Sequence, residues 1–126
     1  MTPEEHLLAA ADDMAKHGLG KRRYLADPTQ WETTPACAYG TLARVSGDYT
    51  LMTLSDDTTE FARVGVDSES VETAARRLAK HLRAKFPDLF HGQWLNAHQV
   101  VTSYNDMPTT TAEDMILAFK EAAHHE

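Results

Sequence analysis

The sequence predicts a mainly α-helical domain, a compact bundle of four to five helices with one small β-hairpin as an option. Three observations support this prediction. Segments with apolar residues at helical spacing recur along the chain. Several of them begin at a capping residue and end near a glycine or proline, the residue types that start and stop helices. Strand-like alternation occurs in one short region, between residues 48 and 67.

The first predicted helix covers residues 3–17. Thr2 offers an N-cap, and Glu5 stands at the spacing of a capping box, in which two side chains satisfy two backbone N–H groups. Pro3 suits the first helical position. Gly18 follows the last turn, and a glycine there favours a left-handed C-terminal cap.

A short second helix is predicted to start at the cap Thr34 and to run to Gly47. Ala36, Gly40 and Ala43 form a small-residue face on it. A glycine in a helix interior costs roughly 1 kcal/mol relative to alanine, so it usually has a packing reason. We therefore expect this helix to be central and largely buried, with another backbone close to it.

The third helix is predicted to be the longest. It should begin at a cap, Asp67 or Ser68, and end at Phe86, because a proline follows. Apolar residues at 4-3-4 spacing make its core-facing seam: Val71, Ala75, Leu78 and Leu82. Before it, residues 49–54 and 61–66 are the candidate strands of the hairpin.

A fourth helix is predicted at about residues 93–104 and a last one at about residues 111–124. Thr110 offers an N-cap for the last helix, and Glu113 follows at the capping-box spacing.

The segment between these two helices is predicted to be a structural turn; the alternative is a functional turn in which Tyr104, Asn105 and Asp106 present polar groups to a ligand or partner. Pro108 disfavours helical backbone at the residue before it, so the fourth helix should end by about Asp106. Tyr104 adds an aromatic side chain, and Asn105 is a turn former. We expect the side chain of Asn105 or Asp106 to hydrogen-bond backbone near residues 37–40, and so to hold the last two helices against the second.

Length and composition predict one domain, residues 1–126, in the cytoplasm. The chain is 42% hydrophobic and 25% charged, as in an ordinary globular protein. Its net charge of −7 argues against a general nucleic-acid binder. A single cysteine excludes an internal disulfide framework and fits a reducing compartment. We expect no signal peptide and no membrane segment, because no apolar run is long enough.

The sequence carries no metal-binding, phosphate-binding or serine-hydrolase motif, so we expect no metal and no cofactor. The candidate catalytic set is Cys37 with His98 and Asn105, which occur in papain-like order. A thiolate at a helix start would be stabilised by the helix dipole. The alternative is a structural Cys37 packed among small residues, since free cysteine is among the most buried residue types.

Basic residues are segregated, which makes them candidates for a partner-binding surface. Eight of the twelve Lys and Arg residues lie either on the third helix or at residues 21–23. A solvated surface is the alternative, and an acidic partner or a phosphate group is the sharper hypothesis. The proposed surface also includes two aromatic residues of the same loop. Its members are Lys21, Arg22, Arg23, Tyr24, Trp31, Arg76, Arg77, Lys80 and Arg83.

Three pieces of the sequence together resemble a family of uncharacterised small proteins of actinobacteria and actinobacteriophages. They are a helix of the kind seen at Leu7–Asp12 followed by a loop with Tyr24, a Cys-x-x-Gly-x-Leu element at Cys37–Leu42, and an aromatic-Asn-Asp-x-Pro turn at Tyr104–Pro108. Members of that family usually carry tryptophan where this chain has Tyr104. The resemblance implies a mainly helical domain in an actinobacterial or phage setting, and it implies no particular activity.

Three functional hypotheses follow. The leading one is a small cytoplasmic regulator, encoded by a phage or mobile element, that binds a host protein without being an enzyme. The second is a cysteine-dependent hydrolase or transferase in which Cys37 is the nucleophile, His98 the base and Asn105 its orienting group. The third is a nucleic-acid-contacting accessory protein that uses the basic helix.

Overall fold

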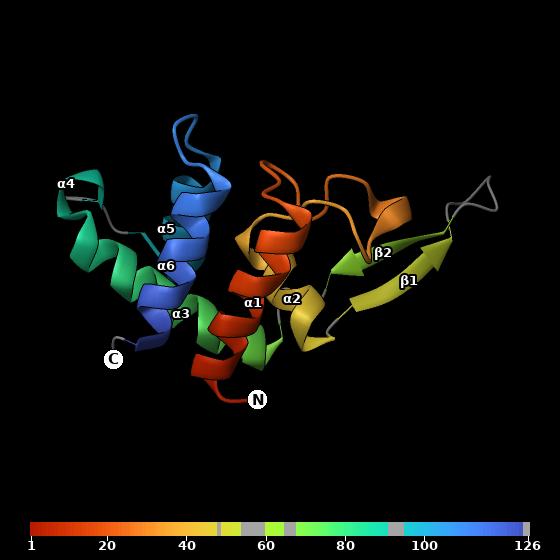
Figure 1. The fold of residues 1–126 in the computed structure, drawn as a ribbon, viewed down its shortest axis with the longest axis horizontal. Coiled ribbons are helices and arrows are strands. Elements are labelled where there is room, and N and C mark those ends of the chain that lie inside the picture. The colour runs from red at the N-terminus through yellow and green to blue at the C-terminus, as the bar shows by residue number, and fades with distance from the viewer. Residues whose placement is uncertain (48, 54–59, 65–67, 91–94, 125–126) are drawn as a thin grey trace.

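The fold is mainly helical, in agreement with the predicted class (Figure 1). A computed structural model describes residues 1–47, 49–53, 60–64, 68–90 and 95–124. Six α-helices occur within these ranges, against the four to five expected; they are α1 (Pro3–His17), α2 (Ala38–Ser46), α3 (Glu69–Lys85), α4 (Pro87–Phe90), α5 (Ala97–Asp106) and α6 (Ala112–His124). The difference is the one-turn helix α4, which begins at a proline in the first helical position.

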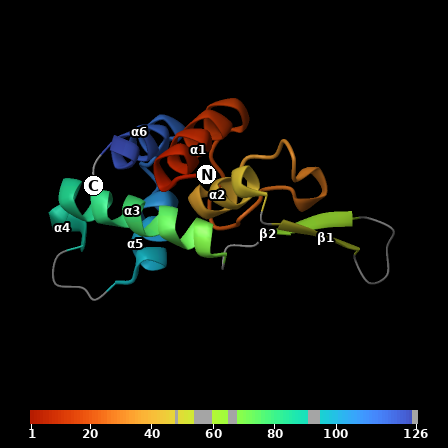
Figure 2. The ribbon, with the colours of Figure 1, turned by 90° about the horizontal axis from the view of Figure 1, so that it is seen from below.

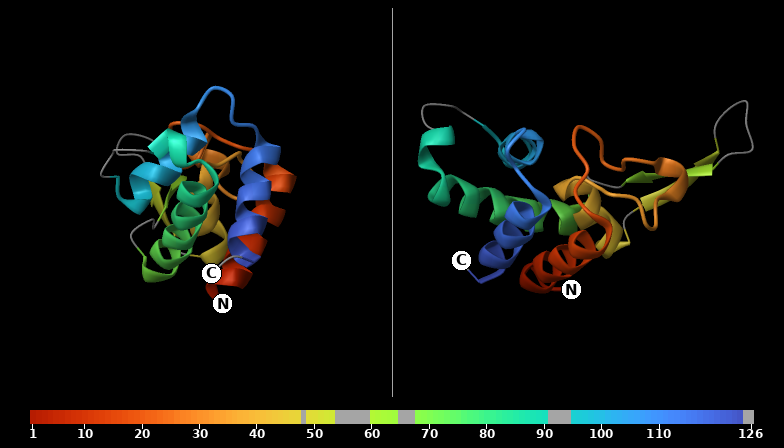
Figure 3. Two further views of the ribbon diagram at one scale, coloured as in Figure 1. Left: turned by 90° about the vertical axis from the view of Figure 1, so that its left-hand side faces the viewer. Right: turned by 45° about the horizontal axis from the view of Figure 1, so that its top comes forward.

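The helices enclose one main core. Helices α1 and α6 lie side by side and antiparallel, since Glu4 near the start of α1 is 3.9 Å from His124 at the end of α6 (Figure 3). Helix α3 packs on α5 and α6, and α2 contacts α1, α3 and α5 (Figure 2). Leu7, Leu42 and Phe119 are fully buried where these helices meet. None of the helices in the described ranges is long and apolar enough to cross a lipid bilayer.

Helices α1 and α3 match their predicted bounds because their signals are local. The capping box between Thr2 and Glu5 is formed, and Gly18 ends α1 with a φ of +89°. Ser68 caps α3, and Phe86 follows its last residue.

Helix α2 is central and buried, as predicted, but it starts later than predicted. Its N-cap is Cys37, and the side chain of Thr34 instead accepts the N–H of Asp27 at 2.9 Å. Ala36 forms bridges with Leu19 and Leu25 in extended conformation. This pairing uses the backbone that the predicted first helical turn would have needed.

Helices α5 and α6 also differ slightly from their predicted bounds. The predicted start of α5 at residue 93 lies outside the described residues, and α5 continues to Asp106 because Pro108 restricts only the residue before it. The predicted N-cap of α6, Thr110, is wrong by one position. Thr111 and Asp114 bond reciprocally, at 3.2 and 3.0 Å, whereas the hydroxyl of Thr110 donates to the carbonyl of Tyr104 at 2.7 Å.

Two strands follow α2, β1 (Tyr49–Thr53) and β2 (Glu60–Val64), and they pair antiparallel with Tyr49 opposite Val64. They lie beside the 3₁₀ turn η1 (Pro28–Gln30), away from the α1–α6 pair (Figure 1). The predicted hairpin segments extend into residues 54 and 65–66, which lie outside the described ranges.

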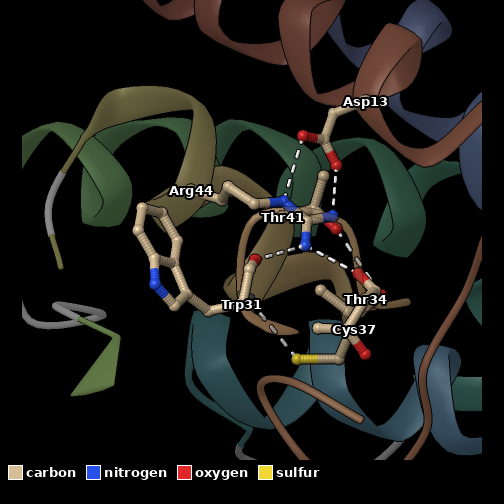
Figure 4. Close-up of polar contacts among 8 residues, drawn as sticks. Asp13, Trp31, Thr34, Cys37, Thr41 and Arg44 are labelled. Atoms are coloured by element: carbon tan, nitrogen blue, oxygen red, sulfur yellow. Dashed lines mark hydrogen bonds and ion pairs between the residues drawn. The ribbon is translucent and has the colours of Figure 1, made fainter. Parts of the chain in front are cut away.

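Arg44 of α2 makes a buried polar cluster that links α1, α2 and the loop between them (Figure 4). Its Nε and one terminal nitrogen donate to the two carboxylate oxygens of Asp13, at 3.1 and 2.5 Å. Its other terminal nitrogen donates to the carbonyls of Trp31, at 3.0 Å, and Thr34, at 2.6 Å. The side chains of Arg44 and Asp13 are only 7% and 14% exposed, so each charge has lost most of its water and is stabilised by the opposite charge of the other residue.

We expect Arg44→Ala to destabilise the protein by about 3 to 5 kcal/mol, because it leaves the carboxylate of Asp13 buried and unpaired. Arg76→Ala is the matched control. It removes an exposed pair with Glu72, which should contribute less than about 1 kcal/mol. Urea denaturation followed by circular dichroism measures both. Equal stabilities of the two variants would contradict the role given to Arg44.

Candidate functional site

A pocket of about 410 Å³ lies where the loop before α2 meets the start of α2 and one face of α5. This volume is within the range of small-molecule sites. We name it the Cys37 pocket, and its lining residues are Arg22, Arg23, Tyr24, Cys37, Ala38, Tyr39, His98, Val101, Thr102, Asn105 and Asp106. The pocket therefore brings together the predicted catalytic set and part of the predicted basic surface, which are far apart in the sequence.

Cys37 occupies the N-cap of α2 and is only 6% exposed. Its sulfur accepts the backbone N–H of Gly40 at 3.4 Å. Burial raises the pKa of the thiol, and the nearby charge of Asp106 raises it further, although the N–H groups of Gly40 and Tyr39 act in the opposite direction. The net shift is upward, so at neutral pH Cys37 is a thiol that caps a helix.

Asn105 links α5 to α2, and the predicted hydrogen bond to backbone near residues 37–40 is confirmed. Its side-chain oxygen accepts the N–H of Ala38 at 2.9 Å, and its amide nitrogen donates to the carbonyl of Gly20 at 3.0 Å. The same nitrogen donates to Asp106, also at 3.0 Å. Asn105 is 1% exposed, so these bonds replace the water that its amide loses.

The basic segment before α2 is fixed on the end of α5. The amine of Lys21 donates to the carbonyl of Met107, and the backbone N–H of Arg22 donates to the carboxylate of Asp106 at 2.9 Å. Cations are favoured at a helix C-terminus, where carbonyls lack partners. Lys21 is thus an anchor, whereas Arg22 and Arg23 are exposed at the pocket.

His98 lies at the pocket between two tyrosines. Its Nε2 is 3.5 Å from the hydroxyl of Tyr24, and its ring centroid is 4.7 Å from that of Tyr39. Burial raises the pKa of Tyr39 to about 12, so this hydroxyl stays protonated. In the catalytic hypothesis Asn105 would orient His98. The structure gives Asn105 a different role, because its amide is bonded to Ala38, Gly20 and Asp106.

The other predicted surface residues lie elsewhere. Trp31 is partly buried and packs against Leu25 and Ala36. Four basic residues of α3 were predicted to bind a partner. Three of them, Arg76, Lys80 and Arg83, line a shallow depression of about 320 Å³ that shares no residue with the Cys37 pocket. The fourth, Arg77, instead donates to the carbonyls of Ala122 and Ala123 at the end of α6, at 2.9 and 2.7 Å.

Gly40 explains how the basic loop reaches the pocket. A Cβ atom there would lie 1.9 Å from the carbonyl oxygen of Tyr24, so the loop backbone crosses α2 in direct contact with this glycine. The small-residue face thus has the packing reason expected of it. Sequence reasoning missed Val101 and Thr102 as lining residues, although their spacing of three and four from His98 places them on its face of α5.

No group of three His, Cys, Asp or Glu side chains suited to a metal ion occurs among the described residues.

A family model, described as a family of unknown function (DUF6197), matches residues 1–125. No curated protein and no solved structure matches the chain significantly.

We expect Gly40→Ala to cost about 3 kcal/mol of stability, because the added methyl group collides with the backbone of Tyr24, which must shift to make room. Gly47→Ala serves as the control. That site has open space and a φ of +80°, so only backbone strain of roughly 1 kcal/mol is expected there. Thermal unfolding compares the two, and a smaller loss for Gly40→Ala than for Gly47→Ala would contradict the close approach.

Proposed function

The chain belongs to this family of unknown function, and from that premise we propose that it is a small cytoplasmic interaction protein which binds a host protein through the Cys37 pocket. The carrying observation is that the pocket presents Arg22, Arg23 and Tyr24 next to the last turn of α5. The resemblance of the sequence to actinobacterial and phage proteins supplies the setting of the proposal, a phage- or mobile-element-encoded regulator.

The chemistry of the pocket rim supports a protein partner. Tyrosine and arginine are enriched among the residues that dominate binding energy at interfaces. Tyr24 is 39% exposed, and both arginines are exposed beside it. The backbone of this segment is held by Asp106 and by contact with Gly40, so the segment loses little conformational entropy of its backbone when a partner binds.

The depression on α3 supports a partner less well. Arg76 is already paired with Glu72 four residues earlier on the same helix. Arg77 is engaged at the end of α6. A partner there would compete with the Glu72 pair, and it would meet only Lys80 and Arg83 as cations without a partner in the described ranges.

We expect the immobilised chain to capture a discrete protein from a host lysate and the Arg22→Glu/Arg23→Glu variant to lose it, because two exposed cations at the pocket are reversed. Lys120→Glu, an exposed reversal on α6, should capture it unchanged. Quantitative mass spectrometry of the bound fraction gives the comparison.

A third variant, Arg76→Glu/Arg83→Glu, separates the two basic surfaces. If only this variant loses the captured protein, the partner binds α3 and the assignment to the Cys37 pocket fails. If the unmodified chain captures nothing that any reversal removes, the interaction proposal itself fails.

A cysteine-dependent enzyme is the second candidate, and one observation favours it: Cys37, His98 and Asn105 line the same pocket. The chemistry needs a thiolate, because the thiol is a poor nucleophile. Burial raises the pKa of Cys37, which disfavours the thiolate. Among the described residues, the hydrogen bond of the His98 ring is to the hydroxyl of Tyr24 and not to the sulfur of Cys37. Binding therefore has more support than catalysis.

Alkylation by iodoacetamide distinguishes the two candidates, since Cys37 is the single cysteine. A raised pKa lowers the thiolate fraction at neutral pH, so we expect slow alkylation at pH 7 that accelerates through a midpoint above that of a free thiol. The unfolded chain in urea should react at the rate of free cysteine. Fast alkylation of the folded chain at pH 7 would support the enzyme instead.

A further inference from the structure

Two cations at the Cys37 pocket lack a partner in the part of the chain that the structure describes. The side chains of Arg22 and Arg23 make no ion pair and no hydrogen bond there. Two other cations near the loop are engaged: Lys21 bonds the carbonyl of Met107, and Arg44 is paired with Asp13. A fold that satisfies its anchoring cations but leaves these two unpaired at a cavity has the donors of an anion site.

We propose that the Cys37 pocket is a receptor for an anionic group, a carboxylate or a phosphate, held by the guanidinium groups of Arg22 and Arg23. The planar fork of N–H donors on each arginine matches the oxygen geometry of both groups. This inference rests on the proposed function, because the partner protein would carry the anionic group as an acidic side chain, a chain terminus or a phosphorylated residue.

The backbone of Arg22 is fixed in an unusual conformation. Its φ is +65°, in the left-handed region that residues other than glycine seldom adopt. The bond from its N–H to Asp106, at 2.9 Å, holds it there. Asp106 is itself held by the amide of Asn105, at 3.0 Å. The strained backbone is thus supported by a chain of two hydrogen bonds that leads to the buried amide of Asn105, and it determines where the side chain of Arg22 leaves the loop.

The charges that line the pocket sum to a positive value. Asp106 is the one carboxylate among the lining residues, and two of the lining residues are arginines. Cys37 adds no negative charge at neutral pH, because burial raises the pKa of its thiol. Tyr39, with a pKa of about 12, is also neutral. His98 and Tyr24 complete the set of titratable lining groups. On a chain of net charge −7, this local balance favours an anion.

The test is a titration of the ¹⁵N-labelled full chain, followed by ¹H–¹⁵N correlation spectra, with phenyl phosphate, benzoate and neutral benzamide. We expect saturable shifts at Arg22, Arg23 and Ala38 with at least one anion and none with benzamide. Arg23→Gln, which leaves the backbone of Arg22 intact, should weaken anion binding about tenfold. Lys120→Gln should leave the affinity unchanged.

Preference between the two anions identifies the source: tighter binding of phenyl phosphate points to a phosphorylated residue, and tighter binding of benzoate to a carboxylate. Equal binding of benzamide, an unchanged affinity in Arg23→Gln, or no saturable shift with either anion would overturn the anion site. Lysate capture that depends on Arg22 and Arg23 without anion binding would leave the partner proposal standing alone. Anion binding without capture would remove the protein partner and keep the site.

Discussion

The burial of the first six residues of α2 is the constraint on which the rest of the structure depends. Six consecutive residues of this helix, Ala38 to Ala43, are buried, so water cannot serve the N–H groups of its first turn. The side chains of Asn105 and Cys37 serve them instead. Asn105 can do so only from the last turn of α5, which fixes that helix against α2, and its amide then also fixes the loop at Gly20. The Cys37 pocket is the space that remains beside this junction.

A second buried link secures the other end of α2. Arg44 places its charge next to Asp13 of α1 and uses its remaining donors on loop carbonyls. A buried ion pair contributes little net stability compared with apolar packing, but loss of one partner is costly. Its stronger consequence here is orientation, since it holds residues 31–34 against α2 while Asn105 holds Gly20. The basic loop at the pocket lies between these two attachments.

The fold was predictable where its signals are local and less so where distant segments compete. The caps of α1 and α3 depend on residues three apart, so both helices were predicted correctly. The predicted start of α2 was wrong because Ala36 pairs with Leu19 and Leu25. No local sequence pattern reveals this pairing. At the site, the bond from Asn105 to α2 was expected. The engagement of Arg77 by the end of α6 was not, because a helix wheel shows a charged face without showing what packs next to it.

The position of Asp106 favours the proposed recognition at the pocket over the thiol chemistry proposed as its alternative. A catalytic thiol needs an anionic state, but Cys37 is placed where burial and Asp106 both disfavour that state. Asp106 also lies at the pocket, where its carboxylate accepts the backbone N–H of Arg22 and holds that strained residue in position. Asp106 disfavours the thiolate of Cys37 but supports the backbone of Arg22, and this combination supports the proposal that the two arginines bind an anionic group. In that arrangement Cys37 contributes a neutral sulfur that caps α2 and leaves the positive charge of the pocket undiminished.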